Sequence, residues 1–168
     1  DLAAYAVKHY NFTTHEGFNA GIWKNDNATD NQAATDYDKK WIPGQWKVPE
    51  AYDNPASNDP WYFSAIREAN YFLETVVPRF EKGEIEGSET NIKHYIGEMY
   101  FLRAKNYLSK LETFGDFPII KNTLPDESES LIQASKRAPR YKVAHFILED
   151  LDQAISLLTN NISGGKNR

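Results

Sequence analysis

The chain has 168 residues and a net charge of −5 at pH 7, with 26% charged and 14% aromatic residues. This length is enough for one domain with a substantial core, which buries about 70% of the surface of the unfolded chain. Acidic and basic residues are interspersed without the basic stripe of a nucleic-acid-binding protein, so we expect no nucleic-acid partner. There is no cysteine, which excludes disulfides and thiolate metal sites, and no apolar run approaches the roughly 20 residues of a membrane span.

The first sixty residues carry one short helical pattern followed by a long irregular stretch. Residues 2–10 have the spacing of the end of a helix. From 11 to 59 this periodicity disappears, and Asn, Asp, Thr, Gly and Pro surround several tryptophans. A loop of this length is uncommon in a compact domain and tends to be functional. We therefore predict a loop-rich candidate ligand region at 11–59 and a helical scaffold at 60–160, within a single helical region covering 1–168.

A second helix is predicted to begin at Asn58-Asp59-Pro60, because Asn or Asp caps a helix and proline is favoured at its first position. Its apolar stripe recurs at helical spacing and comprises Tyr62, Ile66, Ala69, Leu73 and Val76. We expect this helix to end before Pro78. The charged residues from Gly83 to Gly87 then form a turn.

The longest helical pattern runs from 91 to 114 and stops abruptly. Its apolar residues form two adjacent stripes, so we predict that this helix packs against neighbours on two sides. Ser88 is the predicted start and Gly115 the predicted left-handed stop, with Pro118 preventing continuation. Residues 117–120 are expected to form a short extended segment under the end of the helix.

The last helix is predicted after a polar, acidic connection at 122–130 that we expect to be mobile. Pro139 opens this helix. Its apolar stripe consists of Ala144, Ile147, Leu148, Leu151, Ala154, Ile155 and Leu158. Three helices of similar length joined by short or medium loops suggest stacked antiparallel pairs, as in tetratricopeptide arrays, although no exact repeat is visible.

One ordered string in the central helix is specific enough to indicate a family. It consists of Glu98-Met99-Tyr100-Phe101-Leu102-Arg103-Ala104, then Tyr107, Leu111 and the run from Phe114 to Ile120. This string resembles the signature of SusD/RagB-type proteins, and the flanking stretches from Trp61 and up to Leu158 agree with it. The resemblance covers 61–158 well and 1–60 only loosely.

The resemblance implies a fold, a function and a location. The implied fold is all-α, with tetratricopeptide-like helical pairs and long irregular loops, as in the N-terminal part of SusD-like proteins. Such proteins are surface lipoproteins of Bacteroidetes that capture nutrients, mostly glycans, for a SusC-like TonB-dependent transporter of the outer membrane. We therefore expect a glycan-binding protein of polysaccharide utilization, with no enzymatic turnover and no cofactor. A lipid anchor upstream of Asp1 and a larger helical remainder downstream of Arg168 are also expected.

The candidate ligand residues are aromatic and amide side chains of the 11–59 region. A sugar ring stacks its C–H face on an aromatic ring and hydrogen-bonds amides and carboxylates through its hydroxyls. Trp23, Asn25, Asp26 and Asn27 supply both kinds of group in one short piece, and Trp41 and Trp46 offer two further rings. The other interpretation is that these tryptophans anchor the loop onto the helices. It is favoured for each single tryptophan, and more strongly for Trp41 and Trp46 because Ile42 and Pro43 lie between them.

Polar residues of the helices are interpreted as structural. Arg103 is expected to pair with Glu98 or Glu68 and so to fix helix register, and Asn70 to bond backbone in a contact between helix and loop. Arg67 belongs to the same group. The four histidines have no metal-ligand spacing and are predicted to lie at the surface or on helix faces.

Two alternative functions remain open at this stage. A helical-repeat module that binds peptide or protein would place its ligand on a concave helix face and not on the tryptophan-rich loop. A glycan hydrolase would need two converging carboxylates, and the acidic residues sit mainly in charged turns. No nucleophile elbow, P-loop or dinucleotide fingerprint is present, and the sequence does not identify the cargo.

Overall fold

In a computed structural model, the chain is described at residues 2–10, 31, 42–45, 47–49 and 60–160. The regular structure of these residues is helical, apart from one isolated antiparallel bridge between Phe117 and Ala138. The prediction of an all-α fold is therefore confirmed. The helices are α1 (Leu2–Val7), α2 (Ser64–Glu81), α3 (Glu89–Phe114), α4 (Ser128–Ala134) and α5 (Arg140–Leu157).

The chain separates into two compact units, Asp1–Ala6 with Pro49–Arg168 and Val7–Val48. The first unit contains the helices, apart from the last residue of α1. Of the second unit only short pieces are described, including a turn at 42–45 in which the Gln45 N–H donates to the Ile42 carbonyl at 2.9 Å.

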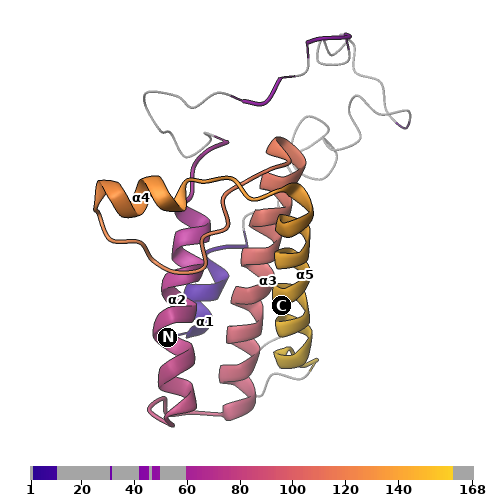
Figure 1. The fold of residues 1–168 in the computed structure, drawn as a ribbon. Coiled ribbons are helices and arrows are strands. Elements are labelled where there is room, and N and C mark those ends of the chain that lie inside the picture. The colour runs from indigo at the N-terminus through magenta and orange to yellow at the C-terminus, as the bar shows by residue number, and fades with distance from the viewer. Residues whose placement is uncertain (1, 11–30, 32–41, 46, 50–59, 161–168) are drawn as a thin grey trace. The chain divides into compact units, whose positions relative to one another are not determined.

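Helix α3 is the centre of the first unit and packs against α2 on one side and α5 on the other (Figure 1). This arrangement confirms the prediction made from its two apolar stripes. The predicted ends are also confirmed, because Ser88 is the N-cap and Gly115 stops the helix with φ at +72°. The turn between α2 and α3 contains two further glycines with positive φ, Gly83 and Gly87. Helices α2 and α3 run antiparallel on either side of this turn (Figure 1).

Helix α2 differs from its prediction at both ends. It begins at Ser64 and not at Pro60, because the preceding residues Trp61 and Phe63 pack against the core instead of entering the helix. Pro78 lies inside the helix, which continues to Glu81. Proline removes a single N–H donor there, and one lost bond in the last turns does not end the helix.

Helix α5 starts after Pro139 as predicted, but its buried face is rotated relative to the predicted stripe. Ile147 and Ala154 are buried as expected, whereas Leu148 is 55% exposed and Ile155 is 73% exposed. The positions buried in their place are Val143, Phe146 and Asp150.

The segment after α3 completes the core. Phe117 is fully buried and stacks on Trp61, Phe63 and Phe114, with ring centroids 5.1 to 5.7 Å apart. The predicted extended segment under the helix end is thus confirmed. Farther along the connection lies α4, which was not predicted, because a seven-residue helix with no buried residue carries little periodic signal.

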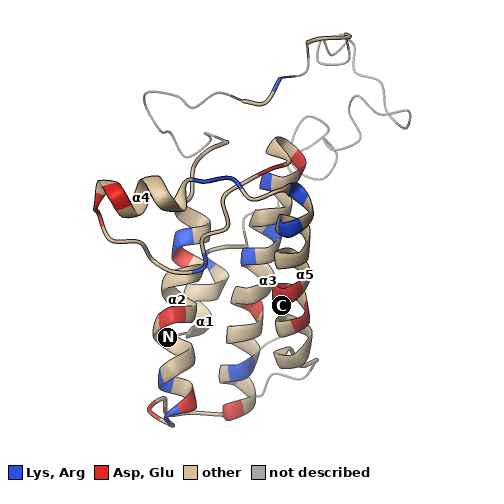
Figure 2. Cartoon of the chain, viewed as in Figure 1, with Lys and Arg blue, Asp and Glu red and all other residues tan. Residues whose placement is uncertain are grey.

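The described surface carries charges of both signs on every long helix (Figure 2). No helix of the described residues is long and apolar enough to cross a membrane.

Candidate functional site

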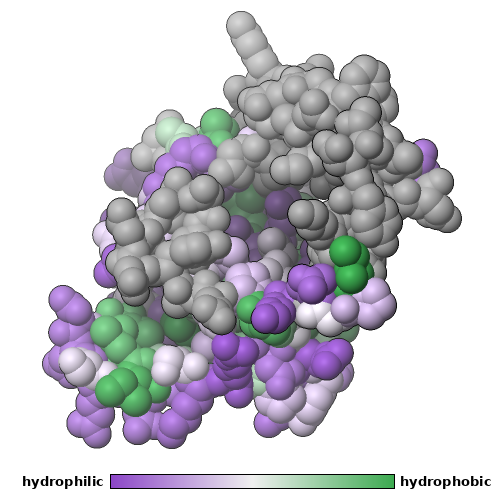
Figure 3. Space-filling view, turned by 90° about the horizontal axis from the view of Figure 1, so that it is seen from above, coloured by the Kyte–Doolittle hydropathy of each residue, from purple (hydrophilic) through white to green (hydrophobic). Residues whose placement is uncertain are grey.

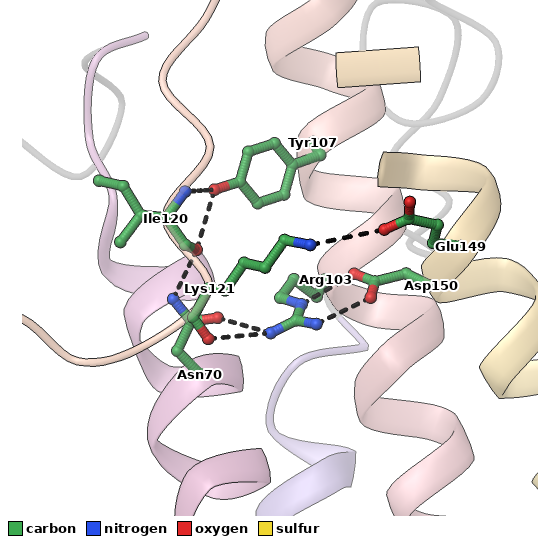
Figure 4. A network of polar contacts seen from close by, with 7 residues as sticks. All are labelled: Asn70, Arg103, Tyr107, Ile120, Lys121, Glu149 and Asp150. Atoms are coloured by element: carbon green, nitrogen blue, oxygen red, sulfur yellow. Dashed lines mark hydrogen bonds and ion pairs between the residues drawn. The ribbon is translucent and has the colours of Figure 1, made fainter. Parts of the chain in front are cut away.

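A buried ion pair joins the two C-terminal long helices. Arg103 of α3 donates to Asp150 of α5 through Nε at 2.8 Å and through Nη2 at 2.7 Å (Figure 4). The side chains are only 7% and 4% exposed. This two-point geometry is the strong form of an arginine–carboxylate contact. The predicted pairing of Arg103 with Glu98 or Glu68 is therefore wrong.

The pKa of Asp150 reflects both the burial of its carboxyl group and its pairing with Arg103. Burial raises the pKa of the Asp150 carboxyl, and the hydrogen bonds and positive charge of Arg103 oppose that shift. The third guanidinium nitrogen of Arg103, Nη1, donates to Asn70 Oδ1 at 2.9 Å and to the Lys121 carbonyl at 3.3 Å. All three nitrogens of the guanidinium thus have partners inside the protein, which is the arrangement of a structural cation.

Asn70 and Tyr107 extend this network to the segment that follows α3. Asn70 Nδ2 donates to the carbonyls of Ile120 at 2.8 Å and Asn122 at 3.3 Å, which confirms the predicted backbone contact. The Tyr107 hydroxyl donates to the Ile120 carbonyl at 3.1 Å and accepts from its N–H at 2.8 Å (Figure 4). Burial raises the pKa of Tyr107 to about 12.

A further clamp holds the same segment against α2. The Glu74 carboxylate accepts from the backbone N–H of Thr123 at 3.0 Å and from its hydroxyl at 2.7 Å. These bonds lower the pKa of Glu74. Residues 120–123 are consequently fixed by side chains of two helices.

This fixed segment forms one wall of a pocket. The pocket has a volume of about 250 Å³. It lies among α2, the segment 120–124 and α4, and its lining consists of Phe63, Ile66, Arg67, Asn70, Ile120, Asn122, Leu124 and Leu131. Most of these side chains are apolar, and Figure 3 shows hydrophobic surface gathered over α4. Periodicity did not indicate this pocket, because the wall and α4 are irregular or short.

The predicted ligand residues lie elsewhere in the chain. Trp23, Asn25, Asp26, Asn27, Trp41 and Trp46 are all outside the described residues, so their assignment remains a prediction. Trp61, which the structure does describe, serves as an anchor: its Nε1 donates to the Pro49 carbonyl at 2.8 Å and its ring packs on Phe114.

The histidines differ in their surroundings. His145 is exposed as predicted, but His94 is 8% exposed. Its Nδ1 accepts from the Thr159 N–H at 3.1 Å, and its Nε2 lies 3.3 Å from Glu98 Oε1. No group of three or more His, Asp or Glu side chains that could hold a metal occurs within the described parts of the chain.

Comparison with known proteins identifies the family. A SusD-like family model, described as "Starch-binding associating with outer membrane", matches residues 2–166. The chain therefore belongs to the SusD-like family, whose members are binding proteins associated with the outer membrane. A solved structure of a SusD-like protein from Bacteroides fragilis is 26% identical and matches with a TM-score of 0.47. That match covers 59% of this chain and only 18% of the solved chain. No curated protein matches.

Proposed function

We propose that this protein captures a glycan at the bacterial cell surface and delivers it to a SusC-like TonB-dependent transporter. The observation that carries the proposal is the family match over 2–166, whose description names starch binding and the outer membrane. Binding is non-covalent and the cargo is released unchanged. A lipid anchor outside this chain holds the protein at the membrane.

The proposed ligand contacts are Trp23, Asn25, Asp26, Asn27, Trp41 and Trp46. Their support is chemical, because tryptophan offers a stacking face and the amides and carboxylate bind hydroxyls. The buried Arg103 network has its polar atoms engaged within the protein, so its role in this function is to hold the scaffold. In this proposal residues 60–160 form the scaffold, and residues of the 11–59 region contact the glycan.

The test is binding of the protein to a panel of polysaccharides in affinity gels. Calorimetry follows, with oligosaccharides of the glycan class that retards the protein in the gel. Retardation by one glycan class without release of reducing sugar is the expected result. Trp23→Ala is expected to weaken binding at least tenfold, since stacking of a sugar face on an aromatic ring is lost. Tyr71→Ala is the matched control, because Tyr71 is an aromatic residue of α2 that is 57% exposed.

Two outcomes contradict the proposal. If no polysaccharide retards the protein while peptides bind it, the cargo is peptide and the alternative function applies. If Trp23→Ala lowers helicity as well as binding, that tryptophan is an anchor and not a ligand contact.

A further inference from the structure

The pocket between α2 and α4 is poorly suited to the sugar cargo proposed above. Five of its lining residues are apolar, namely Phe63, Ile66, Ile120, Leu124 and Leu131. The buried amide of Asn70 is committed to the network, because Nδ2 donates to two carbonyls and Oδ1 accepts from Arg103. Most hydroxyls of a sugar placed here would lose water without gaining a hydrogen-bond partner, which is costly.

One charged group of the lining is available to a ligand. Arg67 lines the pocket and is exposed, and its guanidinium makes no hydrogen bond or ion pair with the residues that the structure describes. Asn122 is also exposed and lines the same pocket. A cation at the edge of an apolar pocket is complementary to a carboxylate attached to an apolar body, since guanidinium binds carboxylates at two points.

The pocket is also prepared in advance for a ligand. Its irregular wall is held by Asn70 and Tyr107 at Ile120 and by Glu74 at Thr123. A wall fixed before binding does not have to be ordered by the ligand, which removes part of the entropic cost of association.

We propose that this pocket binds a small amphipathic monocarboxylate, with its apolar body among α2, the 120–124 segment and α4 and its carboxylate on Arg67. Size supports this class: an apolar cavity of roughly 150 Å³ accepts benzene, so the 250 Å³ here accommodates a ring with a short arm. None of the residues proposed to contact the glycan belongs to the lining of this pocket.

The first test compares hydrocinnamate with hydrocinnamide, which have the same ring and arm and differ in charge. Calorimetry and ligand-observed NMR on the full chain are expected to show hydrocinnamate binding about tenfold more tightly, the effect of one hydrogen-bonded charge. Arg67→Gln should abolish that preference. Arg79→Gln, at an exposed arginine of α2 that pairs with Glu84 and does not line the pocket, should retain it.

The second test locates the site with neighbouring residues of α4. Leu131 lines the pocket and is 43% exposed, whereas Ile132 is 63% exposed and lies outside the lining. Leu131→Asp is expected to weaken hydrocinnamate at least tenfold, because a carboxylate would enter the apolar wall and repel the ligand. Ile132→Asp should bind like the unmodified protein, and both variants should keep the native circular dichroism.

Three results would overturn the proposal: equal binding of acid and amide, equal effects of the two α4 substitutions, or no binding by a protein of native helicity. None of them bears on glycan capture, which the polysaccharide panel tests independently.

Discussion

Arg103 places a permanent positive charge at a position that is only 6% exposed, where it is balanced by Asp150 across two hydrogen bonds. Replacing Arg103 by Met would leave the carboxylate buried without its partner. We expect a loss of about 3 to 5 kcal/mol in the free energy of unfolding. Urea denaturation followed by circular dichroism measures this loss.

The matched control for that prediction is Arg79→Met, because Arg79 faces Glu84 at 3.8 Å with both side chains more than half exposed. Exposed pairs contribute at most about 1 kcal/mol. The double variant Arg103→Met with Asp150→Leu should recover much of the loss, because no buried charge remains. A double variant as unstable as the single one would show that packing, and not charge, dominates at this position.

Tyr107 makes stability depend on pH in the alkaline range. The folded-state pKa is raised to about 12, while the unfolded value is about 10. Between these values the folded chain binds more protons than the unfolded chain, so stability falls as pH rises through the window. Relative to Tyr107→Phe, the unmodified protein should lose about 2 to 3 kcal/mol between pH 10 and pH 12.

The measurement is a series of urea transitions at rising pH on the protein and the Tyr107→Phe variant. Near neutral pH the variant should be less stable by about 1 to 3 kcal/mol, because the Ile120 N–H loses its acceptor. Tyr71→Phe, at a ring that is 57% exposed, is the control. A constant difference between Tyr107→Phe and the unmodified protein at every pH would contradict the assignment.

At the level of single residues, sequence reasoning identified the structural cation but not its partner. Arg103 and Asn70 lie within the family string and its flank, and their structural role was predictable from it. Asp150 lies 47 residues farther along the chain from Arg103. Periodicity assigns an acidic residue to the solvent face of a helix, and only the three-dimensional packing of α5 on α3 reveals that Asp150 points inward.

The rotated face of α5 gives a prediction at the level of the helix. Ile147 is 6% exposed and its neighbour Leu148 is 55% exposed, although both belonged to the predicted stripe. Ile147→Ala should cost about 2 to 5 kcal/mol through lost burial and a cavity. Leu148→Ala should change stability by less than about 0.5 kcal/mol. Equal losses of stability in the two variants, measured by thermal or urea unfolding, would contradict the observed orientation and support the one predicted from the sequence.

The contact between α3 and α5 is close enough to require a glycine. A Cβ added at Gly97 would lie 3.1 Å from the Leu157 Cβ and 3.2 Å from the Ala154 carbonyl oxygen. Glycine to alanine inside a helix ordinarily gains about 1 kcal/mol, but here we expect a net loss of about 1 to 3 kcal/mol from overpacking. Ser109→Ala, on the exposed side of α3, is the control and should change stability little.

Element boundaries were predictable where local chemistry decides them. Ser88 and Gly115 define α3 because a cap and a left-handed stop need no distant contact. The start of α2 was not predictable, since Asn58-Asp59-Pro60 offers a good local start that the packing of Trp61 and Phe63 overrides. Helix α4 gave no signal because none of its residues is buried.

On the scale of the whole chain, the sequence assigned scaffold and ligand region to different stretches. The three long helices agree with the predicted all-α fold, whereas the division itself stays a prediction. Choosing individual ligand residues is harder, because an aromatic ring in a loop stacks equally well on a sugar or on a helix. The family description names starch binding but no contact residue.

The buried polar network around Arg103 gives a prediction about how the first unit unfolds. Through Arg103, the polar contacts link α3 to α5, to α2 and to the segment after α3. Elements joined by one buried network are expected to unfold as a cooperative unit. In Arg103→Met, the exchange protection of core amides in all three long helices should therefore fall by a similar factor.

Helix α4 provides the internal reference for this hydrogen-exchange measurement, because it has seven residues and none is buried. Its amides should exchange quickly in both proteins and should respond little to the substitution, since local opening already exposes them. If protection fell in α5 while α2 kept its native value, the Asn70 link would be too weak to couple the helices. The wall of the pocket would then depend on Tyr107 and Glu74, and its shape would survive the loss of the ion pair.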